Sequence, residues 1–515
     1  MKKLQNQGSK HSFGGGSFYN LLNKDIKELN TVILSLFIII FLFSVGFISY
    51  KFSNSYALFS DEVTGVKTIE ATVKLSNLDK SGANEPVLDS SMIPVYYDES
   101  SSSWRKADVK NHNDKYKWYD YDNKMWANSV TVSETNRSKY QSANLGTEIP
   151  MDDILTMEVW IPRYKYKVFN YNSNGSITSS PEEIKIKWET DNQTTGEINC
   201  TNKVQGSNGD GTSETCKLNE TNTVCTDDTC NDKYYTHPGF WRDENDNLTH
   251  ETSEEKTGFW MGKFETTGST TSITTLPNKT PITNTAVGTF YNNIQKMNKT
   301  NNAYGFDNTV DTYMARNMEW GAVSYLSHTK YGTCTKGVCT EVGINNKGTM
   351  NTSNSTGSGT ITGCGSAPNS SASTTCNVYN QVGVIASTTG NIYGVYDMSG
   401  GNYEYVSASM IKSDGNFYAP TGITYGPSRK YHDYYSYGTT DTDAASRKRG
   451  KLGDASKETA MWYDDTKSQV YVSAYWMGRS LAFNNTNLAG IFSYHRISQT
   501  GSSYFSSRLV ISNNN

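Results

Sequence analysis

Residues 393–406 read YGVYDMSGGNYEYV, which sets an aspartate, two adjacent glycines, an asparagine and a glutamate among tyrosines. No catalytic triad and no phosphate-binding loop has this pattern. The run therefore indicates either metal binding or a structural turn, and the choice between them depends on the surrounding chain.

The composition favours short strands and many turns. Of the 515 residues, 35% are hydrophobic, and 35 Tyr, 18 Phe and 10 Trp supply much of the apolar material. Aromatic residues favour strands and pack well in cores, whereas the 42 glycines and the abundant Asn, Ser and Thr favour turns. The formal net charge of −4 gives no reason to expect a nucleic-acid partner.

Residues 31–50, TVILSLFIIIFLFSVGFISY, contain no charged residue. A helix of this length spans roughly 30 Å, the thickness of the hydrocarbon core of a bilayer. Lysines dominate the charges before it, so the positive-inside rule predicts a cytoplasmic tail of residues 1–30 and an extracellular chain after Lys51. A signal peptide cleaved near Ala57 is the alternative, but the apolar run is long for one. We expect a cell-membrane protein with a single N-terminal span.

Eight cysteines fall into two groups of four, which fits an oxidising exterior. Each group lies in a polar, Cys-rich insertion, where local disulfides would reduce the entropy of the unfolded loops. We expect nearest-neighbour pairing, although four cysteines allow three connectivities. The expected pairs are Cys200–Cys216 and Cys225–Cys230 in residues 190–235, and Cys334–Cys339 and Cys364–Cys376 in residues 330–380. Zinc is disfavoured because the sequence lacks CxxC pairs with nearby histidines.

Residues 51–150 carry the alternation of apolar and polar residues that is typical of strands. The predicted strands are 68–76, 92–99 and 115–133, the last with a turn at Asp122–Asn123. We interpret the region as a small membrane-proximal β-rich unit. The pattern fits equally well with first strands that pack on the main domain.

Residues 151–515 form the predicted main domain. Strand patterns occur at 157–171 and 258–268, and a helix pattern occurs at 315–328. The predicted class is α+β, with short strands, few helices and long loops.

Six pieces of this domain occur in an order that resembles the formylglycine-generating enzyme/sulfatase-modifying-factor superfamily. They read VWIPRY, GFWMGKFETT, NMEWGAVSYLS, GVYDMSGGNYEYV, YWMGRS and SSRLVI, between about residues 157 and 511. The resemblance implies a C-type-lectin-like fold for residues 151–515.

The resemblance also implies a structural calcium ion at the opening stretch. By position, its ligands would be the side chains of Asp397 and Glu404 and the carbonyls of Gly400 and Asn402. Calcium takes six to eight oxygen ligands, and glycines let a chain fold tightly enough to present them. A glycine-rich turn without a metal is the alternative.

Catalysis is not expected. The oxidase members of the superfamily hold copper with two cysteines near the C-terminus, whereas the last cysteine here is Cys376. The seven histidines are scattered along the sequence, and motifs for a nucleophile, a metalloprotease or a phosphate loop are absent from it.

Residues 479–508 are rich in Asn, Ser, Tyr and Arg, the residue types of adaptable recognition surfaces. The segment resembles the variable region of diversity-generating-retroelement target proteins, which share the lectin-like fold. The ligand-binding positions implied by this resemblance are Leu481, Phe483, Asn484, Asn485, Asn487, Ser493, Tyr494, His495, Arg496, Ser498, Thr500, Ser503 and Tyr504.

The sequence thus predicts a membrane-anchored surface protein that displays a non-catalytic lectin-like domain. Its expected partners are the membrane and an extracellular protein or glycan. The alternatives are a modifying enzyme of the same fold with an altered active site, and a structural envelope protein.

Overall fold

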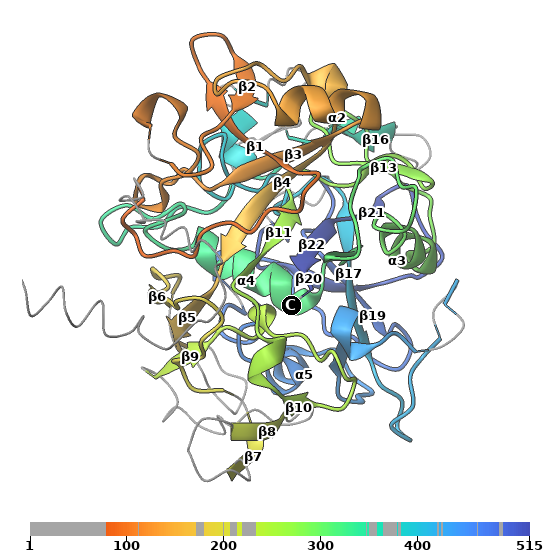
Figure 1. Cartoon of the computed structure of the whole chain (residues 1–515). Coiled ribbons are helices and arrows are strands. Elements are labelled where there is room, and N and C mark those ends of the chain that lie inside the picture. The colour runs from red at the N-terminus through yellow and green to blue at the C-terminus, as the bar shows by residue number, and fades with distance from the viewer. Residues whose placement is uncertain are drawn as a thin grey trace, which may run out of the picture. The chain divides into compact units, whose positions relative to one another are not determined.

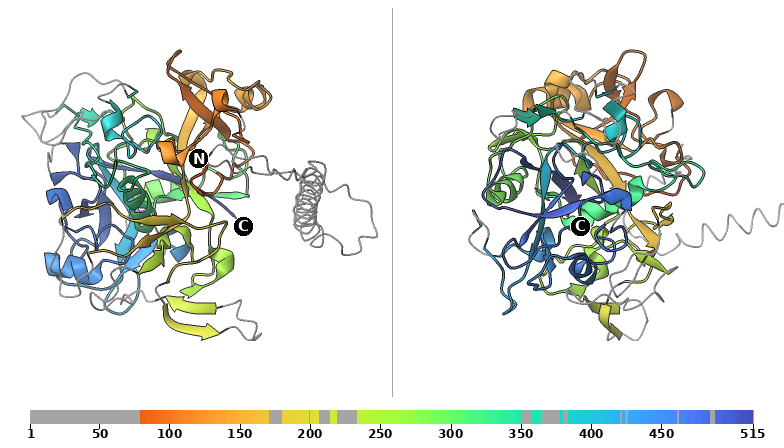
Figure 2. Two further views of the ribbon diagram at one scale, coloured as in Figure 1. Left: turned by 90° about the vertical axis from the view of Figure 1, so that its left-hand side faces the viewer. Right: turned by 180° about the vertical axis from the view of Figure 1, so that it is seen from behind.

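The computed structural model describes most of the chain from residue 79 onward, and all described residues belong to one compact unit (Figure 1, Figure 2). The described ranges are 79–111, 113–170, 180–198, 200–205, 214–218, 233–346, 348–349, 358–363, 378–379, 383–419, 422–423, 426–460, 462–483 and 488–514. Within these ranges, every helix is too short or too polar to span a bilayer. The predicted tail 1–30, membrane segment 31–50 and strand 68–76 lie outside them.

A seven-stranded antiparallel sheet holds much of the core. Its order is β14–β22–β11–β4–β3–β1–β2. The strands are β14 Val310–Met314, β22 Leu509–Asn513, β11 Gly258–Gly262, β4 Ile154–Pro162, β3 Asn128–Val132, β1 Ile93–Asp98 and β2 Ser103–Lys106. Trp160 of β4 lies opposite Trp260 of β11, and the centroids of their buried rings are 5.2 Å apart. Aromatic side chains thus build this core, as the composition predicts.

The predicted domain boundary at residue 150 does not separate two units. Strand β3 pairs with β4 across that boundary, with Asn128 opposite Val159, and β1 and β2 extend the same sheet. The described part of the 51–150 region therefore supplies the first strands of the main domain, which was the alternative interpretation.

A second sheet contains the strand that follows the opening stretch. Its order is β18–β17–β19–β20, and β21 also pairs with β17. The strands are β18 Asp433–Tyr435, β17 Tyr403–Met410, β19 Trp476–Arg479, β20 Tyr494–Ile497 and β21 Phe505–Ser507. Strand β17 pairs in parallel with β18 and with β21. The β17–β19 and β19–β20 pairs are antiparallel.

The paired glycines of YGVYDMSGGNYEYV form the tight turn into β17. Gly400 and Gly401 have φ angles of 74° and 69°, in the left-handed region that glycine tolerates best. A Cβ atom on Gly401 would lie 2.3 Å from a carboxylate oxygen of Glu265, and one on Gly400 would lie 2.5 Å from the Asn345 carbonyl. The turn therefore needs glycine at both positions for conformation and for space.

The helix predicted at 315–328 is α4, Asn317–Ser327. Arg316 is its N-cap residue, and the Glu319 carboxylate accepts from the Arg316 amide, as in a capping box. Every residue of α4 is buried, and Figure 1 shows α4 among the strands. The other described α-helices are α2 Glu134–Gln141, α3 Val287–Ile294 and α5 Asp443–Arg449.

The predicted strands at 115–133 are wrong over most of that range, although the turn predicted at Asp122–Asn123 is present. Only β3 is a strand there, because the chain before it folds back through two 3₁₀ turns, η1 Asp114–Tyr116 and η2 Tyr121–Asn123. Trp118, Tyr121 and Trp126 are all buried. The alternation of aromatic and polar residues before β3 therefore reflects a folded-back loop whose aromatic rings pack into the core.

The remaining described strands form small sheets. They are β5 Tyr164–Lys167, β6 Ile186–Trp188 and β9 Tyr234–Thr236; β7 Cys200–Gln205, β8 Glu214–Leu218 and β10 Thr249–His250; β12 Thr267–Ser269 with β13 Ser272–Thr274; and β15 Gly348–Thr349 with β16 Ser358–Thr360. The group of β7, β8 and β10 lies at the bottom of Figure 1. Many short strands with few helices confirm the α+β class for the described part.

Candidate functional site

A cavity of about 110 Å³ lies where β5, β9, β18 and the start of α4 meet. Aromatic rings from four segments line it: Tyr166, Tyr235, Trp241 and Tyr434. Three histidines and several charged side chains line the rest. The cavity is therefore amphipathic, with apolar faces and polar groups brought together from segments far apart in the sequence.

The short 3₁₀ turn η5, Pro238–Phe240, brings one wall against α4. His237 caps this turn, since its Nδ1 accepts from the Gly239 amide at 3.1 Å. A Cβ atom on Gly239 would lie 2.8 Å from the carbonyl of Met318. Glycine at this position thus allows η5 to pack directly on the first turn of the helix.

A buried arginine and aspartate form the wall at the N-terminus of α4. The Asp433 carboxylate accepts from the Met318 amide at 2.8 Å and lies 3.8 Å from the Arg316 guanidinium. Arg316 also donates to the Trp241 carbonyl at 2.9 Å and pairs with Glu319 at 3.2 Å. Burial raises the pKa of Asp433, while the Arg316 charge opposes that shift. The helix N-terminus therefore already has an internal carboxylate as its partner.

Two of the cavity histidines, His237 and His432, are neutral at pH 7. Burial lowers the pKa of His237 to about 3 and holds the pKa of His432 well below its usual value. The two ring nitrogens of His432 bond to the hydroxyls of Ser407 and Ser409, at 2.9 and 2.8 Å. These rings are fixed polar surfaces rather than titrating groups near pH 7.

The other acidic side chains of the lining also have internal partners. Glu255 pairs with Arg163 and lies 2.5 Å from the Nε2 atom of His250. Asp243 accepts from the amides of Asn247 and Leu248 at 2.9 and 2.7 Å. The carboxylates of the wall are thus held in place by internal partners.

Part of the predicted recognition segment is buried. Leu481, Phe483, Ser493 and Tyr494 are 3%, 4%, 0% and 0% exposed. Tyr494 belongs to β20, lies opposite Arg479 of β19 and donates to a backbone carbonyl at 3.2 Å. The prediction of these four as surface ligand contacts is wrong, because Tyr494 is an interior residue of β20 and the other three are buried in the segments that follow β19 and precede β20.

The rest of that segment lies partly at the surface. His495, Arg496, Ser503 and Tyr504 are half-buried, and Ser498 and Thr500 are exposed, whereas Asn484, Asn485 and Asn487 lie outside the described residues. Arg496 pairs with Asp441 and lies 4.9 Å from the centroid of the Tyr471 ring. These side chains form no part of the cavity lining.

The cavity is not evident from the histidines taken one at a time. His237 lies within the aromatic run YYTHPGFW, His250 follows that run in the sequence, and His432 lies in KYHDYY. Two histidine-containing aromatic runs in a chain of this composition are the signal that could have pointed to a shared site.

The predicted calcium ligands lie close to one another but have internal partners. The Glu404 carboxylate pairs with Arg508, whose Nε donates at 2.8 Å. Both oxygens of Asp397 accept hydrogen bonds, from the Asn345 side chain at 2.9 Å and from a backbone amide at 2.7 Å. The Gly400 carbonyl accepts from the Ser480 hydroxyl.

Burial raises the pKa of Asp397 to about 7, although the Arg508 charge opposes the shift. The Asn402 side chain donates to Glu265 at 3.0 Å, while its Oδ1 atom has no partner among the described residues. As a set, these residues do not fit a calcium ion, because an arginine already neutralises Glu404. Calcium at this turn stays a prediction.

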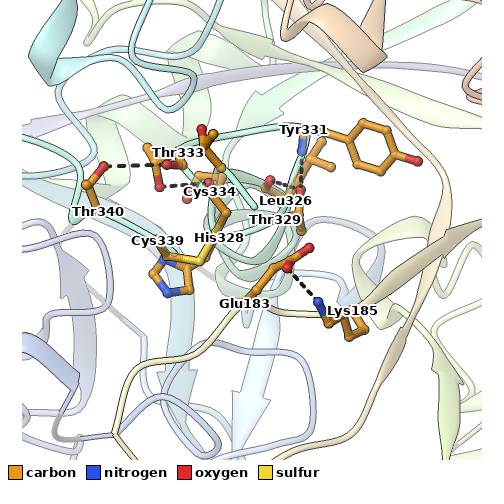
Figure 3. The surroundings of a disulfide bond; sticks show 12 residues. Glu183, Lys185, Leu326, His328, Thr329, Tyr331, Thr333, Cys334, Cys339 and Thr340 are labelled. Atoms are coloured by element: carbon orange, nitrogen blue, oxygen red, sulfur yellow. Dashed lines mark hydrogen bonds and ion pairs between the residues drawn. A yellow bond between two sulfur atoms is a disulfide. The ribbon is translucent and has the colours of Figure 1, made fainter. Parts of the chain in front are cut away.

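The disulfide predicted between Cys334 and Cys339 is confirmed (Figure 3). A ring nitrogen of His328 and the two sulfur atoms lie within 4.8 Å of one another, a proximity that the sequence did not reveal. The disulfide leaves no thiolates there to bind a metal.

The side chains of the other three predicted disulfides lie outside the described part of the chain. Cys225, Cys230, Cys364 and Cys376 lie outside the described residues, and only the backbone is described at Cys200 and Cys216. In the β7–β8 register, Cys216 lies opposite Lys203 and Cys200 lies opposite Leu218.

No family model and no curated protein matches the sequence of this chain. The superfamily resemblance therefore stays a prediction that rests on the six motifs.

Proposed function

We propose that this chain is a membrane-anchored, non-catalytic ligand-binding protein and that the cavity between β9, β18 and α4 is its ligand site. The observation that carries the proposal is the lining: aromatic rings beside carboxylates and histidines that already have internal partners. Side chains held in this way need little reordering when a ligand arrives, and their preorganisation favours affinity.

The same observation favours binding over catalysis. A general base has to be free to accept a proton from its substrate, and its pKa is usually tuned toward the working pH. His237 and His432 instead remain neutral across the physiological range, and Asp433 is engaged by an amide and a guanidinium. The wall offers fixed donors, acceptors and ring faces for a small polar ligand or for one unit of a larger one.

The order of the elements supports a lectin-like domain. The motif VWIPRY runs from β4 into β5, GFWMG is β11 and NMEWGAVSYLS is α4. The opening stretch leads into β17, YWMGRS contains β19, and SSRLVI joins β21 to β22. Each superfamily-like motif thus lies at an element of one of the two main sheets or at the helix between them.

A ligand screen tests the proposal. The purified full-length chain is tested against a panel of mono- and disaccharides and short peptides by thermal shift, and binding of each hit is measured by calorimetry. We expect Trp241→Ala and Lys451→Ala to weaken binding at least tenfold, because both side chains line the cavity.

The exposed Tyr437 provides the matched aromatic control, since it does not line the cavity. Binding that survives both cavity substitutions but is lost in Tyr437→Ala would refute the location. Oxygen consumption with stoichiometric copper or iron in the purified chain would overturn the non-catalytic assignment.

A further inference from the structure

Lys451 differs from the other cationic side chains of the cavity lining, because its ammonium group forms no ion pair with a carboxylate among the described residues. Arg429 pairs with Asp246 at 3.3 Å, and Arg316 is held by carboxylates at the start of α4. The half-buried Lys451 instead places its ammonium 5.3 Å from the centroid of the Tyr435 ring. Its charge and its hydrogen-bond donors are therefore available to a ligand.

The backbone around Lys451 is fixed against the cavity wall. The Lys451 amide donates to the Asp454 carboxylate at 2.8 Å, and the buried Leu452 lines the cavity beside it. A Cβ atom on Gly453 would lie 2.8 Å from the Cδ atom of Pro238. The segment thus packs directly on the 3₁₀ turn η5, and the stem of Lys451 begins at a defined place in the wall.

His250 gives the lining a buried polar atom that lacks a partner. The ring is only 3% exposed, and its Nε2 atom donates to the Glu255 carboxylate at 2.5 Å. Its Nδ1 atom is also buried and forms no hydrogen bond within the described part of the chain. A buried polar atom without a partner is unfavourable. A ligand hydroxyl can supply that partner, because it donates to a neutral ring and accepts from a protonated one.

Trp241 adds a fixed aromatic face next to this atom. Its ring stacks on the His250 ring, with centroids 5.8 Å apart and an angle of 27° between the planes. The Trp241 Nε1 atom donates to Glu254 at 3.0 Å, which holds the ring in one orientation. The negative face of an aromatic ring attracts the weakly positive C–H groups of a sugar ring.

The charges of the lining favour a ligand with one negative charge. The Lys451 ammonium matches a single carboxylate, and such a charge-assisted hydrogen bond is stronger than a neutral one. A phosphate group is a poorer match, because it carries nearly two negative charges. The lining also contains the carboxylates of Asp243, Glu255 and Asp433, which would repel a second charge.

We propose that the cavity binds a uronic acid, a sugar whose ring carries a carboxylate. The carboxylate binds the Lys451 ammonium, a ring hydroxyl pairs with His250 Nδ1, and the C–H face of the ring packs on Trp241. This inference rests on the proposed function, since it names the ligand class of the same cavity. A neutral sugar would leave the ammonium without a counter-charge, and a carboxylic acid without hydroxyls would leave the His250 nitrogen unpaired.

Calorimetry with three matched probes tests the inference on the full-length chain. Glucuronate is compared with glucose, which lacks the carboxylate, and with cyclohexanecarboxylate, which lacks the hydroxyls. We expect glucuronate to bind at least about tenfold more tightly than either, the effect of one charge-assisted hydrogen bond. In Lys451→Gln, the affinity for glucuronate should fall to that for glucose, while the affinity for glucose stays unchanged.

Lys412→Gln is the matched control. Lys412 is also half-buried and lies 5.6 Å from the centroid of a tyrosine ring, that of Tyr418, but it does not line the cavity. Its replacement should leave all three affinities unchanged. Salt gives a second readout on the unaltered chain, because the affinity for glucuronate should fall between about 20 and about 500 mM salt, while that for glucose should not.

Equal affinities for glucuronate and glucose would overturn the inference, as would tighter binding of cyclohexanecarboxylate or no binding of any of the three probes. A preference for glucuronate that survives in Lys451→Gln would overturn it too. The proposed function fails separately. If glucuronate binds equally well to wild type, Trp241→Ala and Lys451→Gln, the ligand site lies outside the cavity, whereas a neutral ligand that loses affinity in Trp241→Ala would leave the cavity as the site.

Discussion

Replacement of Arg508 by methionine tests how the two main sheets are held together. Arg508 is fully buried and pairs with Glu404 of β17. It also donates to the carbonyls of Gly262 and Tyr396, both at 2.9 Å. One side chain therefore connects β11, β17 and the turn before β17, and methionine would fill much of its volume without its charge or donors.

The expected loss of stability is large. Removing one partner of a buried ion pair typically costs about 3–5 kcal/mol, and each buried carbonyl that loses its donor adds about 1–3 kcal/mol. Protonation of Glu404 limits the first cost, because burial already raises its pKa. We expect Arg508→Met to lower the free energy of unfolding by at least about 4 kcal/mol, a large share of the stability of a typical domain.

Urea unfolding at pH 7, followed by tryptophan fluorescence, measures the effect. Glu404→Gln alone should also destabilise, because it leaves the Arg508 charge without its partner. The double variant should cost at least about 2 kcal/mol less than the sum of the two single variants, since the residues act as a pair. A loss below about 1 kcal/mol in Arg508→Met, or strict additivity, would refute this account of the pair.

Three further changes have definite expected outcomes. Burial raises the pKa of Glu158 from 4.5 to about 8, so the folded chain keeps a proton that the unfolded chain releases, and stability falls as the pH rises through this window. Urea unfolding should show Glu158→Gln equal to wild type near pH 4 and more stable at pH 9 by up to about 5 kcal/mol; equal pH slopes would contradict this. Gly401→Ala should lower the melting temperature more than Gly415→Ala, because both have positive φ angles but only Gly401 has a close neighbour, and equal losses would contradict the steric argument. Replacing Cys334 and Cys339 by serine should lower the melting temperature, because the disulfide restricts the unfolded chain, and an unchanged melting temperature would contradict this.

Local patterns allowed several elements to be predicted from the sequence. The helix at α4 followed from apolar residues at helical spacing, and the Cys334–Cys339 disulfide followed from proximity in the chain. Both depend on interactions between near neighbours, which a sequence displays directly.

Burial in the C-terminal segment could not be predicted in the same way. Tyr494 and Ser498 have the same polar, turn-favouring surroundings in sequence, yet one is an interior residue of β20 and the other is exposed. The difference depends on the pairing of β20 with β19, which is a tertiary contact. The cavity was missed for the same reason, because His237 and His432 meet only after β9 and β18 converge on α4.

Hydrogen exchange with and without a ligand from the screen tests the central claim most directly, because it reports where binding occurs without altering the chain. We predict slower exchange at residues 235–243 and 432–434, which contain many of the residues that line the cavity, with the ligand recovered unchanged by mass spectrometry. Protection confined to residues 498–504, or conversion of the ligand into a product, would contradict the account.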